Sequence, residues 1–287
     1  MKYFDYAATT PMSEEAIKTF VSVSQKYYAN TNSLHEMGEQ SKQLYDQCRT
    51  HLGSLIGSNP DQLFFTKGGS EANILAIESL LKRHHGKHII VSQAEHNSII
   101  EMCHQKEREG YNVTYLSFNQ NGQVDLTELN SELRYDTAVV IVQHVNGEIG
   151  TIQPVEEIAN ICKQNGVFFH VDAVQSFGRL KLSHLPERVD SLSVSSHKVY
   201  GPKGVGLLYL NEANNKGIER LLLKGNTIDL PSVAAFTVAA YEIIKQQTFE
   251  ETRLSKLRNQ LINELEVIHN DLTMAILIKR KFHLLLD

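Results

Sequence analysis

One lysine stands where its amine could do chemistry. Lys198 follows an apolar run that we expect to form a strand, and it precedes the turn Gly201-Pro202. A lysine between a buried strand and a tight turn is shielded from water, and burial lowers the pKa of an amine so that it can attack a carbonyl. An aldehyde cofactor that forms a Schiff base with Lys198 would explain this position.

Polar groups also follow three other expected strands. Gly69 and Ser70 belong to a Gly-Gly-Ser turn that opens a helix, and the backbone amides of such a turn can bind a phosphate. His96 and Asp172 come shortly after two further strands. Each has a simpler interpretation as well: Ser70 and Asp172 as helix caps, and His96 as a structural histidine.

Together these positions form one consistent pyridoxal phosphate (PLP) site. Asp172 would pair with the pyridinium nitrogen, His96 would lie against the ring, and Lys198 would hold the aldehyde carbon. The phosphate would be bound by Ser70, Ser195 and His197.

Short β-branched runs alternate with helix-period segments, and several of the runs are apolar on both faces. That pattern is typical of parallel strands covered by helices on two sides, so the sequence predicts an α/β fold with a mainly parallel sheet. In such a sheet a ligand binds at the carboxyl ends of the strands. The expected strands are residues 63–65, 88–91, 113–116, 138–142, 167–171, 191–194 and 206–210. The expected helices are residues 13–28, 39–55, 71–84, 97–109, 126–133, 155–164, 232–245 and 250–269.

Composition excludes several classes of protein. The sequence has 28 Lys and Arg residues against 33 Asp and Glu residues, a net charge of −5, which argues against a nucleic-acid binder. No apolar run approaches the roughly 18 residues of a membrane-spanning helix, and Asp5 interrupts the N-terminus where a signal peptide would be apolar. We therefore expect a cytoplasmic protein without membrane contact.

The cysteines predict neither a disulfide framework nor a metal site. Cys48, Cys103 and Cys162 are too far apart in the sequence for a CxxC motif, and each falls in a helical pattern where a small apolar role is the simplest interpretation. The histidines at 84, 85 and 88 straddle a helix end and a strand start, so we expect no metal there either.

The chain resembles the cysteine desulfurase branch of the class V aminotransferase family. The matching motifs follow the family's order from Tyr3 to about Tyr209. They are FDYAATTP (4–11), NTNSLHEMG (30–38), FFTKGGSEANILAI (64–77), AEHNSI (94–99), HVNGEIGTIQP (144–154), FHVDAVQSFG (169–178) and SSHKVYGPKGVGLLY (195–209). The resemblance implies the large domain of a fold-type I PLP-dependent transferase, usually a homodimer, that moves sulfur from L-cysteine to an acceptor protein, as in iron–sulfur cluster assembly.

The resemblance also implies roles for individual residues. Lys198 would carry the cofactor, His96 would stack on it and transfer protons, and Gln175 would bond its phenolate oxygen. Asn30 would help to hold the substrate carboxylate, and Thr227 would reach the phosphate in the neighbouring subunit. The implied cofactor-binding set is Gly69, Ser70, His96, Asp172, Gln175, Ser195, His197, Lys198 and Thr227.

Three departures from the family pattern affect the expected chemistry. The sequence ends at Asp287, before the family's loop with the persulfide cysteine and before its substrate-binding arginine. Gly147 replaces an asparagine whose amide contacts the phenolate oxygen, which we expect to leave space beside the ring. The stretch before Thr227 is short, with Lys224 and Asn226 in place of the usual glycines and arginine, and residues 270–287 match no family motif.

These observations predict an N-terminal arm (1–15), a PLP-binding large domain (16–230) and a helical remnant (231–287) of a small domain that is largely missing. We expect the apolar face of residues 232–245 to be exposed as a result. The leading hypothesis is a PLP-binding desulfurase relative without the persulfide loop. The alternatives are an acceptor-independent PLP lyase and a non-catalytic relative that pairs with a full-length desulfurase, so whether the chain is an enzyme stays open.

Overall fold

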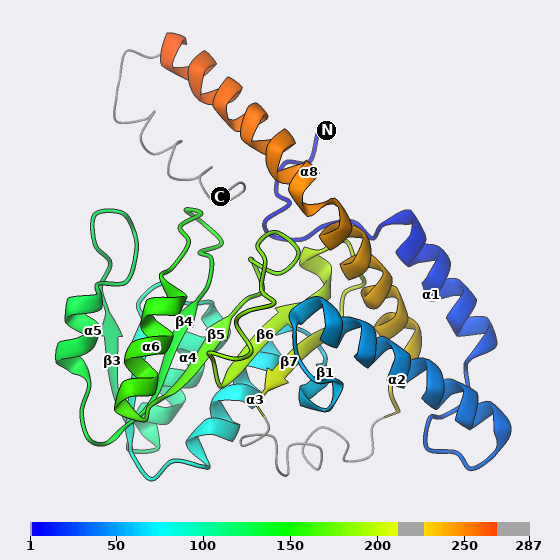
Figure 1. Cartoon of the computed structure of the whole chain (residues 1–287), viewed down its shortest axis with the longest axis horizontal. Coiled ribbons are helices and arrows are strands. Elements are labelled where there is room, and N and C mark those ends of the chain that lie inside the picture. The colour runs from blue at the N-terminus through cyan, green and yellow to red at the C-terminus, as the bar shows by residue number, and fades with distance from the viewer. Residues whose placement is uncertain (1, 212–226, 269–287) are drawn as a thin grey trace.

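A seven-stranded sheet forms the centre of the molecule. The computed structural model describes residues 2–211 and 227–268 (Figure 1). The strand order is β1-β7-β6-β5-β4-β2-β3; β7 runs antiparallel to both of its neighbours, β1 and β6, and the other four neighbouring pairs of this sheet are parallel. The predicted α/β fold with a mainly parallel sheet is therefore confirmed. The strands are β1 (Leu63–Thr66), β2 (His88–Ser92), β3 (Asn112–Leu116), β4 (Thr137–Gln143), β5 (Phe168–Asp172), β6 (Ser191–Ser195) and β7 (Gly206–Leu210).

The helices largely follow the sequence pattern. One expectation is wrong, because the two helices predicted at 232–245 and 250–269 form a single helix, α8. The helices are α1 (Glu14–Lys26), α2 (Glu36–Ile56), η1 (Pro60–Gln62), α3 (Gly69–Leu81), α4 (Asn97–Arg108), α5 (Leu126–Glu132), α6 (Val155–Asn165), η2 (Ser196–Lys198) and α8 (Leu230–Ile268).

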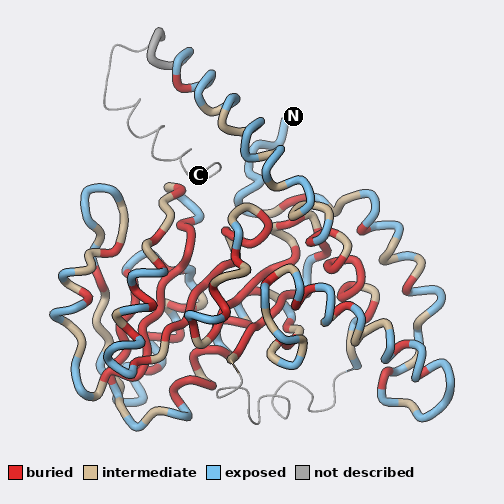
Figure 2. Tube along the Cα trace, viewed as in Figure 1, coloured by how far each residue is buried: buried red, intermediate tan, exposed pale blue. Residues whose placement is uncertain are grey.

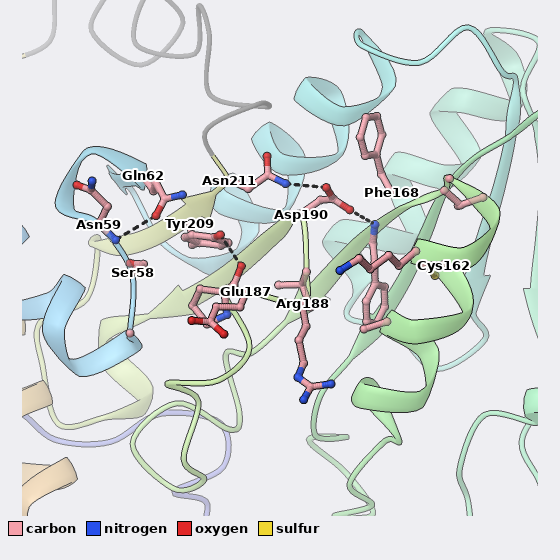
Figure 3. A pocket seen from close by; sticks show the side chains of 18 residues that line it. Ser58, Asn59, Gln62, Cys162, Phe168, Glu187, Arg188, Asp190, Tyr209 and Asn211 are labelled. Atoms are coloured by element: carbon pink, nitrogen blue, oxygen red, sulfur yellow. Dashed lines mark hydrogen bonds between the residues drawn. The ribbon is translucent and has the colours of Figure 1, made fainter.

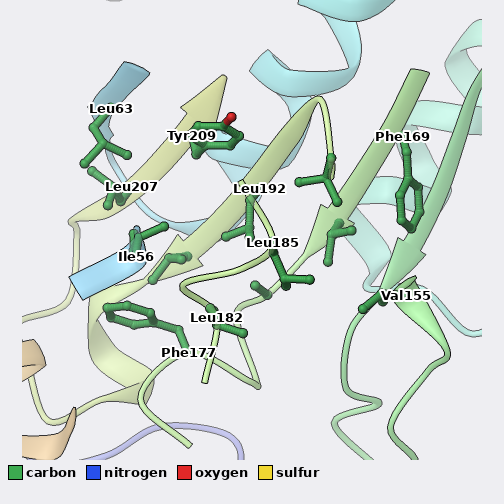
Figure 4. Packing of buried hydrophobic residues seen from close by; sticks show 14 of the residues in the cluster. Ile56, Leu63, Val155, Phe169, Phe177, Leu182, Leu185, Leu192, Leu207 and Tyr209 are labelled. Carbon is green, nitrogen blue, oxygen red and sulfur yellow. The ribbon is translucent and has the colours of Figure 1, made fainter. Parts of the chain in front are cut away.

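Helices cover both faces of the sheet, as the two-sided apolar strands predict. Along β4, Val140 and Val142 belong to one core cluster, whereas Val139 and Ile141 belong to another on the opposite face. The first cluster includes side chains of α2, α6 and α8, and the second includes side chains of α3 and α4. Figure 4 shows part of the first cluster, with Phe177 of the loop that follows β5 lying near the strands.

The N-terminal half of α8 is part of this core. Val233, Phe236 and Ala240 are at most 2% exposed, and the Phe236 ring meets Phe177 edge to face at 6.2 Å. The helix packs against α1 and α2. The expected exposure of residues 232–245 is therefore wrong for most of the apolar side chains. The C-terminal half of α8 instead extends away from the sheet and is mostly exposed (Figure 2).

Local sequence explains why two helices end where they do. Gly166 directly follows α6 with φ of 67°, a left-handed conformation that costs glycine little. Gly110, with φ of 87°, follows the last turn of α4. Both helices therefore stop just before the amino end of the next strand. The polar loops that form the site lie at the other end of the sheet, after the carboxyl ends of the strands.

Candidate cofactor site

A cavity of about 570 Å³ opens at the carboxyl ends of β2, β4, β5 and β6. Its lining comes from loops that are distant in sequence, because parallel strands deliver their carboxyl ends to the same edge. The structure brings eight of the predicted residues together here. They are Gly69, Ser70, His96, Asp172, Gln175, Ser195, His197 and Lys198.

Lys198 lies in η2, immediately after β6. Its Nζ donates hydrogen bonds to the carbonyl oxygens of Ala7 (2.5 Å) and Ala8 (2.9 Å) in the N-terminal arm. Burial and the nearby Arg179 guanidinium lower the pKa of the Lys198 amine, and the carboxylates of Asp172 and Asp5 partly oppose this shift. The direction is the one that an amine needs to act as a nucleophile.

Asp172 is the last residue of β5 and is 5% exposed. Its Oδ1 accepts a hydrogen bond from the Val174 amide (2.9 Å), and its Oδ2 accepts one from Asn73 Nδ2 (2.8 Å). Burial raises the pKa of this carboxyl, whereas the two hydrogen bonds and the charges of His96 and Lys198 lower it. The carboxylate is thus held firmly, in the orientation set by two donors.

His96 is the N-cap residue of α4. Its Nδ1 accepts a hydrogen bond from the Ser98 amide (3.1 Å) and lies 2.8 Å from Ser98 Oγ. Because Nδ1 acts as an acceptor, the neutral ring carries its hydrogen on Nε2. The cap therefore fixes both the ring's position at the cavity wall and its tautomer.

The first turn of α3 provides the groups expected to bind a phosphate. Gly68 is the N-cap, no side chain caps the helix, and Ser70 lies in the first turn, so the predicted capping role of Ser70 is wrong. The hydroxyl of Ser70 is left to line the cavity. A Cβ at Gly69 would come within 2.6 Å of Val174 Cγ2, so a larger side chain would need Val174 to move.

Ser195 lies opposite this turn and offers a buried polar group to a ligand. Its hydroxyl is buried and has no hydrogen-bond partner among the described residues. A buried unpaired hydroxyl costs free energy unless a ligand or water satisfies it. His197 is nearby and its Nδ1 lies 3.0 Å from Thr9 Oγ1.

A second cavity, of about 540 Å³, adjoins the first at this end. It shares Gly69, Ser70, Ser195 and His197 with the first cavity and adds two cationic side chains, Lys67 and Lys203, and one carboxylate, Glu71, which accepts from the Lys67 amide (2.6 Å). The combination of helix-terminal amides, hydroxyls and positive charge suits an anion.

The Gln175 side chain lies next to Gly147. A Cβ at Gly147 would lie 2.8 Å from Gln175 Nε2, and this Nε2 donates to the Ala7 carbonyl oxygen (3.1 Å). The Gln175 side chain therefore occupies the position next to Gly147 and binds the arm, whereas the expected space beside the cofactor ring stays a prediction.

Two predicted residues lie outside both cavities. Asn30 is exposed, and its Oδ1 accepts a hydrogen bond from the Asn32 amide (2.9 Å). Thr227 is exposed shortly before α8. Lys224, Asn226 and residues 270–287 lie outside the described residues.

All three cysteines are buried in helices, as the sequence predicts. Cys48, Cys103 and Cys162 are at most 4% exposed, and none of them lines the cavity with Lys198. Burial raises the pKa of all three thiols, to about 12 for Cys103 and Cys162. Thiols in this state are poor nucleophiles.

Sequence reasoning assigned no role to Asn73, Glu95 or Arg179. Glu95 lines the cavity, and its Oε1 accepts from the Gln143 amide (2.7 Å) and from Ser92 Oγ. Its Oε2 is buried and has no partner among the described residues. Burial raises the pKa of Glu95 to about 8. Asn73 and Glu95 lie inside quoted motifs, but only the folded chain shows what they contact.

A larger cavity of about 630 Å³ lies at the other end of the strands, where β5 and β6 begin (Figure 3). None of the predicted site residues lines it. Asp190 is one of its polar lining residues, and its two oxygens accept from the Phe169 amide (2.9 Å) and from Asn211 Nδ2 (2.7 Å). These polar groups hold the local backbone together.

The described part of the chain has neither a membrane-spanning helix nor a cluster of metal-binding side chains. No helix within residues 2–211 and 227–268 has both the length and the apolar character needed to cross a membrane. In the same ranges, no group of three or more His, Cys, Asp or Glu side chains is placed to hold a metal ion.

Comparison with known proteins places the chain in a family. Residues 2–245 match the family model for class V aminotransferases. The cysteine desulfurase IscS of Histophilus somni strain 2336 is 37% identical over 280 residues, which covers 93% of this chain and 69% of the relative. A solved NifS-like protein has a TM-score of 0.86 at 28% identity and covers 92% of this chain and 75% of its own. A structure described as SspA in complex with cysteine has a TM-score of 0.79 at 34% identity, and the match covers 84% of this chain and 72% of the SspA chain.

The chain belongs to the class V aminotransferase family, whose members use PLP. Within that family it is a relative of the cysteine desulfurases. The residues of the cavity fit this cofactor: an amine of lowered pKa, a buried carboxylate, and an unpartnered hydroxyl beside the first turn of a helix. The family assignment made from the sequence is thus confirmed.

Proposed function

We propose that the chain holds PLP covalently on Lys198 and acts on L-cysteine. The observation that carries the proposal is the shared cavity in which a partly buried amine and a buried carboxylate face the first turn of α3. The desulfurase relatives, and the SspA structure with bound cysteine, support L-cysteine as the substrate.

When bound, PLP would supply an electron sink for negative charge that develops at the substrate Cα. Asp172 would hold a proton on the ring nitrogen, which strengthens that sink. Ser70, Ser195 and the amides at the start of α3 would bind the phosphate. Lys198 Nζ and His96 Nε2 would take and return the Cα proton, since both residues line the cavity.

The burial of the cysteines bears on what happens to the sulfur. Desulfuration converts cysteine and an acceptor thiol into alanine and a persulfide, and no thiol of this sequence lines the cavity. The acceptor thiol for this reaction would therefore be none of Cys48, Cys103 and Cys162, and a sulfur-acceptor protein is one source of it.

The same observation favours an acceptor-independent lyase as a second candidate. In that reaction cysteine and water yield pyruvate, ammonia and hydrogen sulfide, with cleavage of the Cβ–S bond and no second thiol. The two reactions share the Cα proton transfer and differ in their products, alanine against pyruvate.

We also propose a homodimer in which Thr227 of one copy approaches the second cavity of the other. Support comes from the exposure of Thr227 and from the charged lining of that cavity, in which two lysines, Lys67 and Lys203, outnumber one carboxylate, Glu71. A pairing with a full-length desulfurase would use the same surface. Size measurement of the purified chain, alone and mixed with such a relative, separates the two arrangements.

An absorbance spectrum of the purified protein with added PLP tests the cofactor proposal. We expect a band that borohydride reduces, with the cofactor mass on the peptide containing Lys198. The variant Lys198→Ala should lose both signals, whereas Lys203→Ala should keep the adduct on Lys198. A wild-type protein without a reducible band would overturn the proposal.

Product analysis then identifies the reaction. Loaded protein is incubated with L-cysteine, with and without an added dithiol, and alanine and pyruvate are measured. Alanine that depends on the dithiol supports desulfuration, and pyruvate formed without it supports the lyase. Loaded protein that yields neither product would contradict action on cysteine and would leave the non-catalytic alternative.

A further inference from the structure

We propose that Asn73 is a positioning residue that holds Asp172 as a carboxylate aimed at the cofactor's ring nitrogen. This inference deepens the proposed function and rests on it for its meaning in catalysis. The contact itself belongs to the protein alone: Asn73 is 1% exposed in α3, and its amide reaches across to the end of β5.

The orientation of the Asn73 amide is fixed from both sides. Asn73 Nδ2 donates to Asp172 Oδ2 (2.8 Å), a contact that stabilises the ionised form of the carboxyl. The opposite atom, Oδ1, is then an acceptor, and it receives the Ser193 hydroxyl and lies 3.1 Å from His170 Nε2. A flipped amide would place its NH₂ group against two donors.

His170 strengthens this arrangement. It is fully buried, its Nδ1 lies 2.8 Å from Ser191 Oγ, and burial lowers its pKa to about 3. The ring is therefore neutral, and its one hydrogen must be on Nε2 because Asn73 Oδ1 accepts there. Two donors on Oδ1 polarise the amide and make Nδ2 a better donor toward Asp172.

Asn73 is also linked to His96, through the hydroxyl of Ser98. Its Nδ2 is 3.4 Å from Ser98 Oγ, which is 2.8 Å from His96 Nδ1. One buried amide thus joins the carboxylate expected at the ring nitrogen to the histidine expected at the ring face.

The charge balance at Asp172 shows why this donor matters. Burial raises the pKa of Asp172, and the groups that lower it are the Val174 amide, Asn73 and the charges of His96 and Lys198. Glu95, across the cavity wall, interacts unfavourably with Asp172 when both are ionised. Loss of Asn73 would make Asp172 more basic, so that a proton shared with the ring nitrogen would move toward the carboxylate.

The first experiment uses the full chain without cofactor. A carboxyl whose pKa is raised by folding loses stability as the pH rises through the folded pKa, and Asn73→Leu raises that pKa further. We expect the gap in denaturant midpoint between wild type and Asn73→Leu to widen as the pH rises. In an Asp172→Asn background the gap between Asn73 and Asn73→Leu should not depend on pH. Glu95 and the histidines are still present in that background, so a pH dependence that came from them would persist there.

The second experiment reads the ring nitrogen directly in the loaded protein. With ¹⁵N-labelled PLP, we expect the nitrogen resonance of Asn73→Leu to shift from the protonated toward the unprotonated position. Ser98→Ala leaves the contact between Asn73 and Asp172 in place and should leave this resonance unchanged. If Asn73→Leu does not fold, Ser193→Ala removes one donor from Oδ1 and should produce a smaller shift in the same direction.

The two experiments separate the possible failures. A gap that does not vary with pH, or a resonance that stays in place, overturns the role of Asn73. A wild-type protein that never captures PLP refutes the proposed function, and the cofactor-free measurement still decides whether Asn73 holds Asp172 ionised.

Discussion

The amine of Lys198 lies 2.5 Å from the carbonyl oxygen of Ala7, on the N-terminal arm. A second carbonyl, that of Ala8, accepts another of its hydrogens at 2.9 Å. A protonated amine has three N–H bonds, but a nitrogen double-bonded to the cofactor carbon keeps at most one. When PLP is attached, the Lys198 nitrogen can therefore keep at most one of its two hydrogen bonds to the arm.

The arm should loosen when Lys198 stops donating to it. We expect faster amide hydrogen exchange in residues 2–9 after PLP loading, and the same change in cofactor-free Lys198→Met. Lys203→Met is the control, because Lys203 lines the neighbouring cavity without a described bond to the arm. Equal exchange in wild type and Lys198→Met would show that these two bonds do not hold the arm.

Arg179 should set the pH at which the protein captures PLP. Its guanidinium donates to the Lys198 carbonyl oxygen (3.1 Å), and its charge lowers the pKa of the Lys198 amine. In Arg179→Gln that pKa rises, so less free amine is present at pH 7 and capture slows about tenfold per pKa unit. The rate of appearance of the cofactor band against pH gives the measurement.

Arg179→Lys keeps the positive charge and is the matched control for this prediction. We expect its pH profile to stay near that of wild type. A profile in Arg179→Gln that does not move to higher pH would mean that burial alone shifts the amine.

Glu95 should make the protein less stable at mildly alkaline pH. Its folded pKa is about 8 against an unfolded value of 4.5, so between pH 6.5 and 8 the folded state retains a proton that the unfolded state has lost. The free energy of unfolding then falls as pH rises, by about 2 kcal/mol across this window. The lowered pKa values of His144 (about 4) and His170 (about 3) act mainly below pH 6.5, with the opposite slope.

Denaturant unfolding at several pH values measures this effect. Glu95→Gln keeps a neutral side chain of the same shape and should lose most of the slope between pH 6.5 and 8. A slope that is unchanged in Glu95→Gln would assign the effect to other groups, Asp172 first among them.

Phe236 tests whether the start of α8 is part of the core. It is fully buried against Phe177, so Phe236→Ala should cost about 3–5 kcal/mol of unfolding free energy. Phe249 lies further along the same helix and is 69% exposed, so Phe249→Ala should change stability by less than about 0.5 kcal/mol. Similar values for the two variants would contradict the described packing of α8.

Much of the fold could be predicted because it depends on local patterns. The run at 206–210 matches β7 to the residue, and the two-sided apolar strands correctly indicate helices on both faces. The reversal of β7 could not be read in the same way, because an apolar five-residue run has no direction of its own. The single helix α8 was missed for a related reason: residues 246–249 (Gln-Gln-Thr-Phe) interrupt the helical pattern, and nothing local shows that the backbone continues as one helix through them.

Some residues of the candidate site could be predicted from the sequence, and others could not. Lys198, Asp172 and His96 are found from the sequence because each follows a strand whose end must face the ligand. Asn73 is not, because its function depends on a contact with Asp172 across 99 positions of sequence. Glu95 likewise stands beside His96 in the chain, and only its burial distinguishes it from an ordinary surface carboxylate.

The reversed strand β7 has a consequence for how the molecule is made. β1, which delivers Gly69, joins the sheet through β7, and β7 joins it through the turn that holds Lys198. Gly69 and Ser195 are more than one hundred positions apart, so they meet only after a long chain closure and the pairing of this hairpin. We therefore expect the cavity to be completed late in folding, so that during refolding the rate of PLP capture would report when β1 and β7 have joined the sheet.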